Sequence, residues 1–186
     1  KRQVQGLCRQ LLQARETISQ LDQEIAPLFH SHPDQEVFAS LPGAGAQRAP
    51  RLLVAYGEDR QRWSAHTVSC FSGIAPVTRQ SGQARWVHHR FVCPKFLKQT
   101  FHEFAAGSIP HSLWANAFYQ WQRKQGKKHH VAVRALAFKW IRIITRCWKD
   151  RTAYDEQRHL ETLRKAGSPL WEYIQHQGPD VGNPLT

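Results

Sequence analysis

Apolar residues recur every three or four positions along the first 28 residues, a spacing that predicts a long amphipathic helix. The seam extends over four heptads, with β-branched residues at several a positions and mostly Leu at d: Val4, Leu7, Leu11, Ala14, Ile18, Leu21, Ile25 and Leu28. Because the seam is narrow and sustained, residues 1–30 are predicted to form a coiled coil, between subunits or folded back within one chain. The alternative is a helix lying on its own domain. Pro27 is expected to end or kink the helix.

A second helical pattern, from Val131 to Lys149, has two distinct faces at about 100° per residue. Its apolar arc predicts core, and holds Val133, Leu136, Ala137, Trp140, Ile141, Ile144, Cys147 and Trp148. The opposite arc is basic and either binds a nucleic-acid backbone or is a solvated face: Arg134, Lys139, Arg142, Arg146 and Lys149.

Between these two patterns, short helical stretches alternate with Gly- and Pro-containing turns. Phe38 to Glu58 is typical of a helix-hairpin-helix, with the turn at Pro42–Gly45, and the amides at the following helix start can hold a phosphate. Pro50 suits this reading only in the first turn of its helix. A plain turn between two helices is the alternative. Further helices are predicted over residues 63–71 (with Ser64 as cap), 94–106 and from Pro110 to Gly126.

The fold class predicted from these elements is mainly α. A coiled-coil helix (residues 1–30) precedes a compact helical domain (37–154) and a C-terminal tail (155–186) with one or two short helices. The last residues, 178–186, are expected to be disordered.

Positive charge is concentrated in the middle of the chain. The whole sequence carries a net charge of +12, and residues 37–151 alone hold nineteen basic against four acidic residues, a net of +15. The flanking segments are slightly acidic. Such a distribution indicates a polyanion partner. A membrane surface is the weaker alternative, because no anchor signal or apolar run of transmembrane length is visible.

The stretch from Ser72 to Arg90 combines two Ser-Gly pairs with several cations and holds no carboxylate from Gly73 to Arg90. Its Gly and Pro residues predict a loop. An exposed hydroxyl surrounded by cations suits a phosphate substrate, since the cations hold the phosphate and offset charge during attack. We expect the second pair to place the Ser81 hydroxyl near a phosphate, in a cationic pocket assembled by helices. A solvated polar turn is the alternative, and Ser72 is the rival nucleophile, interpreted as a cap or turn residue.

The cysteines and the first residue bear on compartment and completeness. The four cysteines form no CxxC pair, which argues against zinc and against a disulfide framework, and fits a reducing cytosol. The histidines show no metal-ligand spacing. With no Met at position 1, the sequence is expected to be a fragment of a longer protein.

Several of these motifs in order resemble a known family. LPGAGAQRAPRLLVAYGE, FSGIAPVTRQSG and FYQWQRKQGKKHHVAVRALAFKWIRIITRCW are similar to the C-terminal half of transposases of the IS-one-ten insertion-sequence family, which are RNA-guided DNA recombinases. The resemblance covers about residues 37–154, and the family places a coiled coil before this part. The triplet Gln80–Gly82, with Gly73–Pro76 before it, is the most specific element.

The resemblance implies that Ser81 is the nucleophile, attacking a DNA phosphodiester to form a covalent phosphoserine link. It also implies a structured guide RNA and a resolvase-like N-terminal domain with four metal-binding carboxylates. We expect no cofactor within this chain, with Mg²⁺ in the other domain. The fragment is expected to be inactive alone, to oligomerise through the coiled coil, and to act in the bacterial cytoplasm on the nucleoid. The residues expected to bind nucleic acid are Arg48, Arg51, Arg79, Gly82, Arg85, His88, His89, Arg90, Lys95, Lys98, Arg134, Lys139, Arg142 and Arg146.

Two departures from the family pattern leave other functions open. Cys93-Pro94 stands where the family has Gly, and the position of Pro50 is usually not Pro. The alternatives are a non-enzymatic helix-hairpin-helix module that binds nucleic acid, and a domesticated transposase remnant kept for assembly.

Overall fold

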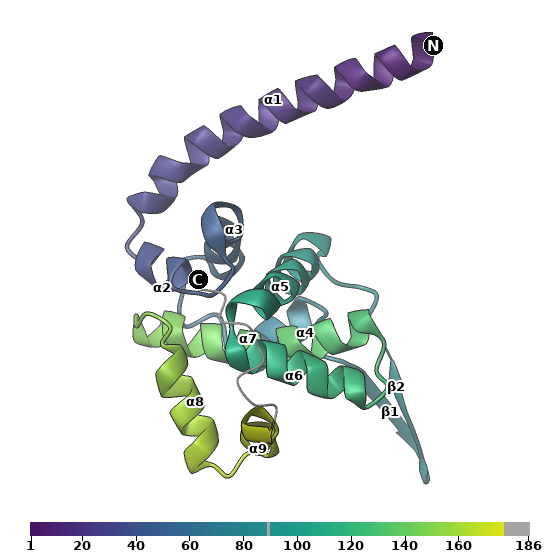
Figure 1. The fold of residues 1–186 in the computed structure, drawn as a ribbon, viewed down its shortest axis with the longest axis vertical. Coiled ribbons are helices and arrows are strands. Elements are labelled where there is room, and N and C mark those ends of the chain that lie inside the picture. The colour runs from purple at the N-terminus through teal and green to yellow at the C-terminus, as the bar shows by residue number, and fades with distance from the viewer. Residues whose placement is uncertain (89, 177–186) are drawn as a thin grey trace.

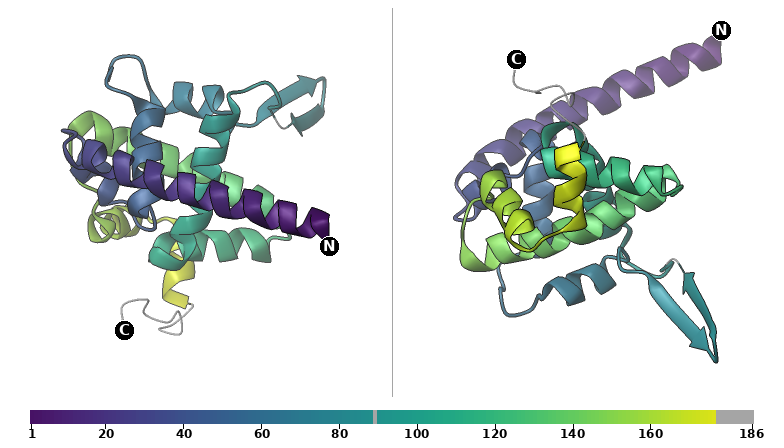
Figure 2. Two further views of the ribbon diagram at one scale, coloured as in Figure 1. Left: turned by 90° about the horizontal axis from the view of Figure 1, so that it is seen from above. Right: turned by 60° about the horizontal axis from the view of Figure 1, so that its bottom comes forward.

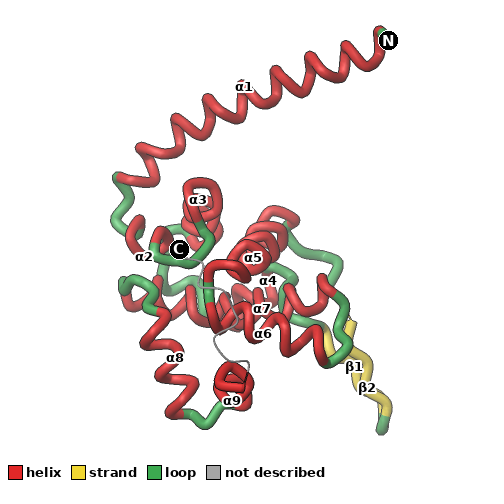
Figure 3. The backbone as a smooth tube through the Cα atoms, in the orientation of Figure 1, coloured by secondary structure: helices red, strands yellow, loops and turns green. Residues whose placement is uncertain are grey.

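The computed structural model describes residues 1–88 and 90–176, which form a helical body from which one helix and one β-hairpin project (Figure 1). The fold is mainly α, as predicted, and the described strands are confined to the hairpin (Figure 3). The elements in chain order are α1 (Arg2–His30), α2 (Gln35–Ala39), α3 (Gly45–Tyr56), α4 (Ala65–Phe71), β1 (Val77–Ser81), β2 (Ala84–His88), α5 (Lys95–Ser108), the 3-10 turn η1 (Ile109–His111), α6 (Leu113–Lys124), α7 (His129–Asp150), α8 (Glu156–Lys165) and α9 (Pro169–His176).

Helix α7 is the centre of the body, and α2, α4, α5 and α6 all pack against it. The predicted apolar arc of α7 is confirmed as core: Trp140, Ile141 and Trp148 are fully buried, and Cys147 is half-buried. Tyr56 of α3 is also buried, and its hydroxyl lies 3.0 Å from Thr145 Oγ1 and 3.2 Å from the carbonyl oxygen of Ile141. The mostly exposed basic arc lies on the other side of α7.

Helix α1 extends away from the body, and only its last turns approach α3 (Figures 1 and 2). The structure therefore contradicts the alternative in which this helix lies along its own domain. Its apolar seam is exposed, with Leu11 and Leu28 each 71 % accessible. Pro27 lies inside the helix, which continues to His30. The coiled coil predicted for residues 1–30 stays a prediction.

The predicted turn between α2 and α3 is tight and packs on the end of α5. Gly43 has a φ of +73°, and a Cβ at this position would overlap the carbonyl of Gly107. The expectation that Pro50 lies in the first turn of its helix is wrong, because Pro50 is the sixth residue of α3. Proline has no backbone N–H, so the carbonyl of Ala46 lacks its usual hydrogen bond within the helix. Ala46 is exposed, and water can donate to this carbonyl instead.

Helix caps account for the starts of two other helices. Ser64 caps α4, as predicted, by accepting a hydrogen bond from the amide of Thr67. The helix predicted from Pro110 instead begins after Ser112, because Pro110 lies in η1 and the Ser112 hydroxyl accepts from the amide of Ala115.

The tail forms α8 and α9, which pack back on the body. Leu170 is 3 % exposed, and Leu160, Leu163 and Ile174 pack against the core. The half-buried Glu156 of α8 accepts hydrogen bonds from the hydroxyl of Ser112 and the amide of Leu113 at the start of α6. The segment 178–186, expected to be disordered, lies outside the described residues. Of the helices described, none has the length and apolar character to cross a membrane.

Candidate nucleophile and candidate nucleic-acid interface

Ser81 lies in a β-hairpin and not in the loop that the sequence predicts. Strands β1 and β2 pair antiparallel, with Val77 opposite His88 and Ser81 opposite Ala84. The two residues between the strands are Gly82 and Gln83, and Gly82 has a φ of +58°. A two-residue turn with Gly first is the type II′ arrangement, which matches the twist of paired strands. Ser81 is therefore the last strand residue before the turn.

The position of Ser81 corrects the expectation of a pocket built by helices. The hairpin projects from the body, and its strands pack chiefly on each other (Figures 1 and 2). Ser81 and its neighbours Gln80 and Gly82 are exposed, so the hydroxyl is neither turned inward nor sealed among apolar side chains. It is open to a strand of nucleic acid that approaches from outside.

The register decides which residues share a face with Ser81. Because side chains alternate along a strand, Arg79 lies on the face of Ser81, and the cross-strand partner of Arg79 is Trp86. Trp86 is 51 % exposed. Thr78 lies on the opposite face. The Ser81 face thus joins a hydroxyl, a guanidinium and an indole, all open to solvent.

The remaining predicted residues of this stretch are placed less closely around Ser81. His88 pairs with Val77 at the far end of the hairpin, and the backbone of Arg85 pairs with Gln80. Arg90 follows the hairpin and is partly buried, and His89 lies outside the described residues.

The base of the hairpin is fixed by the Gly-Ile-Ala segment before β1. Ile74 and Ala75 are buried, and the amide of Ala75 donates to the carbonyl of Ser69 at 2.8 Å. Gly73 has a φ of +72°, and a Cβ there would overlap the side chain of Cys93. Cys93, which departs from the family pattern, therefore lies against Gly73 and closes the base of the hairpin from the other side.

Ser72 is fully buried, and its hydroxyl donates to the carbonyl of Ser69 at 3.3 Å. It is the C-terminal cap residue of α4. This agrees with its interpretation as a cap or turn residue, and a buried hydroxyl is not accessible to a DNA strand.

Arg48 and Arg51 of the hairpin-like α2–α3 element both make contacts within the protein. Arg48 donates to the carbonyl of Gly43 at 2.9 Å, and its guanidinium lies beside Gly107. Arg51 pairs with Glu103 of α5 at 2.5 Å. The guanidinium of Arg51 and the amide of Gln99 both lower the pKa of the Glu103 carboxyl, the amide having the larger effect. Both arginines thus have intramolecular partners in this structure.

The other predicted cations lie on two helices. Lys95 and Lys98 occupy the first turn of α5, and Lys98 Nζ donates to the carbonyl of Arg90 at 3.4 Å. The remaining cations lie along α7: Arg134, Lys139, Arg142 and Arg146, of which the last three are exposed. The structure therefore separates the predicted set into the hairpin with the start of α5, the α2–α3 element, and the outer face of α7.

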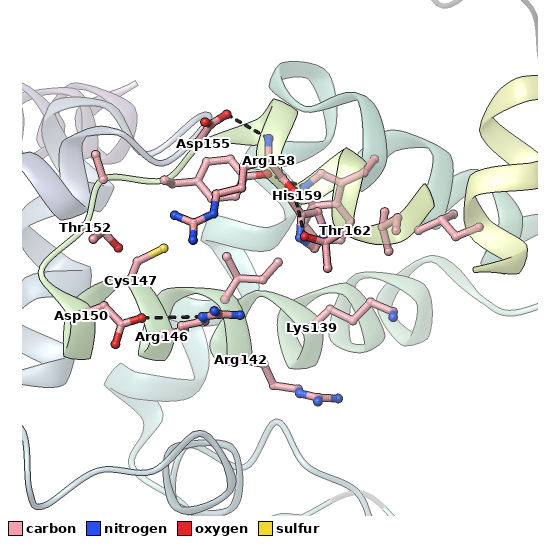
Figure 4. Close-up of a pocket in the computed structure, with 16 residues that line it drawn as sticks. Lys139, Arg142, Arg146, Cys147, Asp150, Thr152, Asp155, Arg158, His159 and Thr162 are labelled. Atoms are coloured by element: carbon pink, nitrogen blue, oxygen red, sulfur yellow. Dashed lines mark hydrogen bonds and ion pairs between the residues drawn. The ribbon is translucent and has the colours of Figure 1, made fainter. Parts of the chain in front are cut away.

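Two residues that sequence reasoning missed extend the α7 face. Arg158 and His159 of α8 line, together with Lys139, Arg142 and Arg146, a cavity between α7 and α8 (Figure 4). Burial and the positive charge of Lys139 lower the pKa of His159, so that its imidazole is neutral at pH 7. The only sequence signal for this site is the Arg-His pair itself, within a tail whose net charge is negative.

No described part of the chain gathers three or more His, Cys, Asp or Glu side chains that could hold a metal ion. The side chains of residues 1–88 and 90–176 therefore do not fit a metal centre.

Comparisons with known proteins show which family part of the chain is similar to. Residues 35–120, which run from α2 into α6 and include the Ser81 hairpin, match the family model described as Transposase IS116/IS110/IS902 family. The "Mini-circle putative transposase for IS117" of Streptomyces coelicolor is 32% identical over 167 residues, which cover 89% of this chain and 40% of that protein.

Two further relatives extend the comparison. The "Insertion element IS110 uncharacterized 43.6 kDa protein" of S. coelicolor is 28% identical over 158 residues, 83% of this chain and 38% of that protein. The "Pilin gene-inverting protein" of Moraxella bovis is 35% identical over 71 residues, 36% of this chain and 22% of that protein. The chain thus spans at most 40% of the length of these relatives. Residues 35–120 match the transposase domain of the IS116/IS110/IS902 family, and most of the chain is similar to insertion-element proteins.

Proposed function

We propose that this chain is the serine-bearing part of a DNA transposase or recombinase, with Ser81 as the nucleophile. The Ser81 Oγ attacks a DNA phosphorus, the Oγ–P bond forms, and the P–O bond to one strand end breaks. The serine proton leaves to a base, and the departing strand oxygen takes a proton. The phosphoserine link preserves the energy of the broken bond, so that a different strand end can reverse the reaction.

The observation that carries this proposal is the exposed position of Ser81 at the hairpin turn, with Arg79 on the same face. A phosphodiester is an anion, and charge grows on its oxygens during attack, so a nearby guanidinium favours both binding and reaction. The segment from Gly73 to Arg90 contains no carboxylate that would repel the substrate. The match of residues 35–120 to a transposase family supports the choice of DNA as the substrate.

The group that removes the proton from Ser81 has to come from outside the hairpin. Residues 77–88 contain no carboxylate, and the imidazole of His88 is on the residue opposite Val77, at the end of the hairpin away from Ser81. An isolated serine hydroxyl is a weak nucleophile at neutral pH. The resemblance implies a resolvase-like domain for this role, whose metal-binding carboxylates and Mg²⁺ would supply activation and charge neutralisation. The exposed hairpin suits a reaction centre completed by another domain.

The other partners follow from charge and from α1. The +15 of residues 37–151 fits DNA together with a structured guide RNA, whose base pairing would supply the sequence specificity. The exposed seam of α1 fits a homo-oligomer. Such a protein would work in the bacterial cytoplasm, on the nucleoid.

The test uses the full-length protein with its DNA and RNA partners, and compares two hydroxyl removals on one hairpin. Ser81→Ala should abolish the covalent protein–DNA adduct seen after denaturing electrophoresis, while DNA binding stays within twofold of the parent. Thr78→Ala removes an exposed hydroxyl from the opposite face and should leave the adduct intact. An adduct that persists in Ser81→Ala would remove the assignment. If every variant, the parent included, binds DNA without an adduct, the non-enzymatic binding module is the better function.

A further inference from the structure

The cavity between α7 and α8 has a volume of about 420 Å³, within the range of small-ligand sites (Figure 4). It is far along the chain from the Ser81 hairpin, and its walls come from α6, α7, α8, the segment between α7 and α8, and the start of α9. Its lining is divided between cationic and apolar side chains, and this division indicates what the cavity can hold.

One end of the cavity carries guanidinium groups from two helices. Figure 4 shows Arg146 along α7 and Arg158 on α8, with Cys147 between the two helices. Arg146 Nε is 3.6 Å from a carboxylate oxygen of Asp150, an exposed pair that water screens. The carboxylate of Asp155 accepts from the backbone amide of Arg158 and so caps α8. Four cations and two carboxylates line the cavity, which leaves it positive.

The other end is mainly aromatic and apolar, with Lys139 as the cation on the side of His159. The ring of His159 lies against buried Trp114, with 4.8 Å between their centroids. Trp114 Nε1 donates to the hydroxyl of Tyr154 at 2.7 Å, which fixes the indole. Ile143 and Leu163 complete this part of the lining together with Leu170. A neutral His159 ring offers a flat face and one hydrogen-bond acceptor without adding charge.

We propose that this cavity holds one unstacked nucleotide of a single-stranded nucleic-acid segment. The phosphate lies between Arg146 and Arg158, and the base enters the apolar end against His159. Flat bases pack well against aromatic rings, and paired guanidiniums suit phosphate oxygens. Free phosphate would leave the apolar end empty, and an apolar ligand would leave the arginines unused. The proposal relies on nucleic acid being the partner, but it does not rely on Ser81.

Binding tests the cationic end. The probes are a fluorescein-labelled 12-nucleotide oligothymidylate and the matching oligouridylate, titrated into the 186-residue chain by fluorescence anisotropy. Arg158→Ala and Arg146→Ala should each weaken binding about tenfold, the effect of losing one charge-assisted contact. The control Arg164→Ala removes an exposed cation from the same helix, one that pairs with Glu161, and should change the affinity less than twofold. Thermal melts confirm that each variant is folded.

Photo-crosslinking tests the base end. A 12-mer with 5-iodouracil at every position should crosslink, on irradiation, to a peptide that contains Tyr154 or His159, as located by mass spectrometry. Arg158→Ala should reduce this crosslink in parallel with affinity. Crosslinks confined to other peptides, or an Arg158→Ala affinity equal to that of Arg164→Ala, would overturn the proposal. A preference for either probe identifies the strand as DNA or RNA. These experiments measure binding and crosslinking without strand cleavage, so failure of this site and failure of the proposed chemistry are distinguishable.

Discussion

The contact between Gly73 and Cys93 gives a prediction about the base of the hairpin. In Gly73→Ala, the new methyl group would overlap Cys93 Sγ and lie 2.9 Å from Cys93 Cβ. Two costs follow. An Ala residue at φ +72° costs about 1–2 kcal/mol, and forcing a methyl group into occupied space costs about 1–3 kcal/mol. The free energy of unfolding should therefore fall by about 2–5 kcal/mol, a large part of the stability of a small domain.

A double-mutant cycle separates these two costs. Cys93→Gly removes both atoms that the methyl group would meet, so Gly73→Ala in that background should lose only the conformational cost. The coupling between the two sites should be about 1–3 kcal/mol, equal to the relieved overlap. Gly126→Ala is the matched control, because Gly126 has a φ of +79° and nothing within 4 Å of its missing Cβ. Its cost should be the same in both backgrounds.

The measurement is urea denaturation of the 186-residue chain, followed by circular dichroism and tryptophan fluorescence. Coincident transitions from the two probes validate the two-state analysis. Two outcomes would show that Cys93 does not close the base of the hairpin. One is that Gly73→Ala unfolds at the same urea concentration as the parent. The other is that Cys93→Gly lowers the free-energy cost of Gly73→Ala no more than it lowers the cost of Gly126→Ala.

Two further predictions concern α1 and α8. Leu11→Glu combined with Ile18→Glu places two charges in the exposed seam of α1. In sedimentation equilibrium, this double variant should be a monomer where the parent is an oligomer. Gln13→Glu adds a charge outside the seam and should leave the oligomer intact. The pKa of His159 is below its ordinary value of 6.5 in the folded protein. At a pH between the folded pKa and 6.5, the unfolded chain therefore binds more protons at this residue than the folded chain does. The free energy of unfolding should therefore fall as pH drops below 6.5, by at most about 1.4 kcal/mol per pH unit for this group. His159→Gln should flatten this slope in urea titrations from pH 7.5 to 5.5, and an unchanged slope would contradict the assignment.

The helical part of the fold was predictable because each helix buries one face. The apolar arc of α7 repeats at helical spacing over its whole length, and the side chains that form it are in the core. The cap at Ser64 is a local signal, and the structure confirms it. The start of α6 was misplaced because Pro110 and Ser112 both favour a helix start, and only the docking of α8 shows which one is used.

The hairpin was not predicted because it buries almost nothing. A strand reveals itself through alternation of buried and exposed residues, and in β1 only Val77 is even partly covered. The available signal was a Gly-Gln turn between β-favouring segments that contain Thr78 and Trp86. The α7–α8 cavity was missed for another reason. Arg146 and Arg158 lie on separate helices that meet only after the chain turns back, and no periodicity connects them.

The paired strands of the hairpin also act as a lever. Five residues of β-strand span about 17 Å, so Ser81 is carried roughly that far from the Gly73–Cys93 contact. A tilt of about 10° at the pivot would swing the hydroxyl through about 3 Å over that span. That displacement is comparable to the reach of a reacting oxygen toward phosphorus. The packing of Gly73 against Cys93 would therefore control the position of the Ser81 hydroxyl, although neither residue lies near the phosphate.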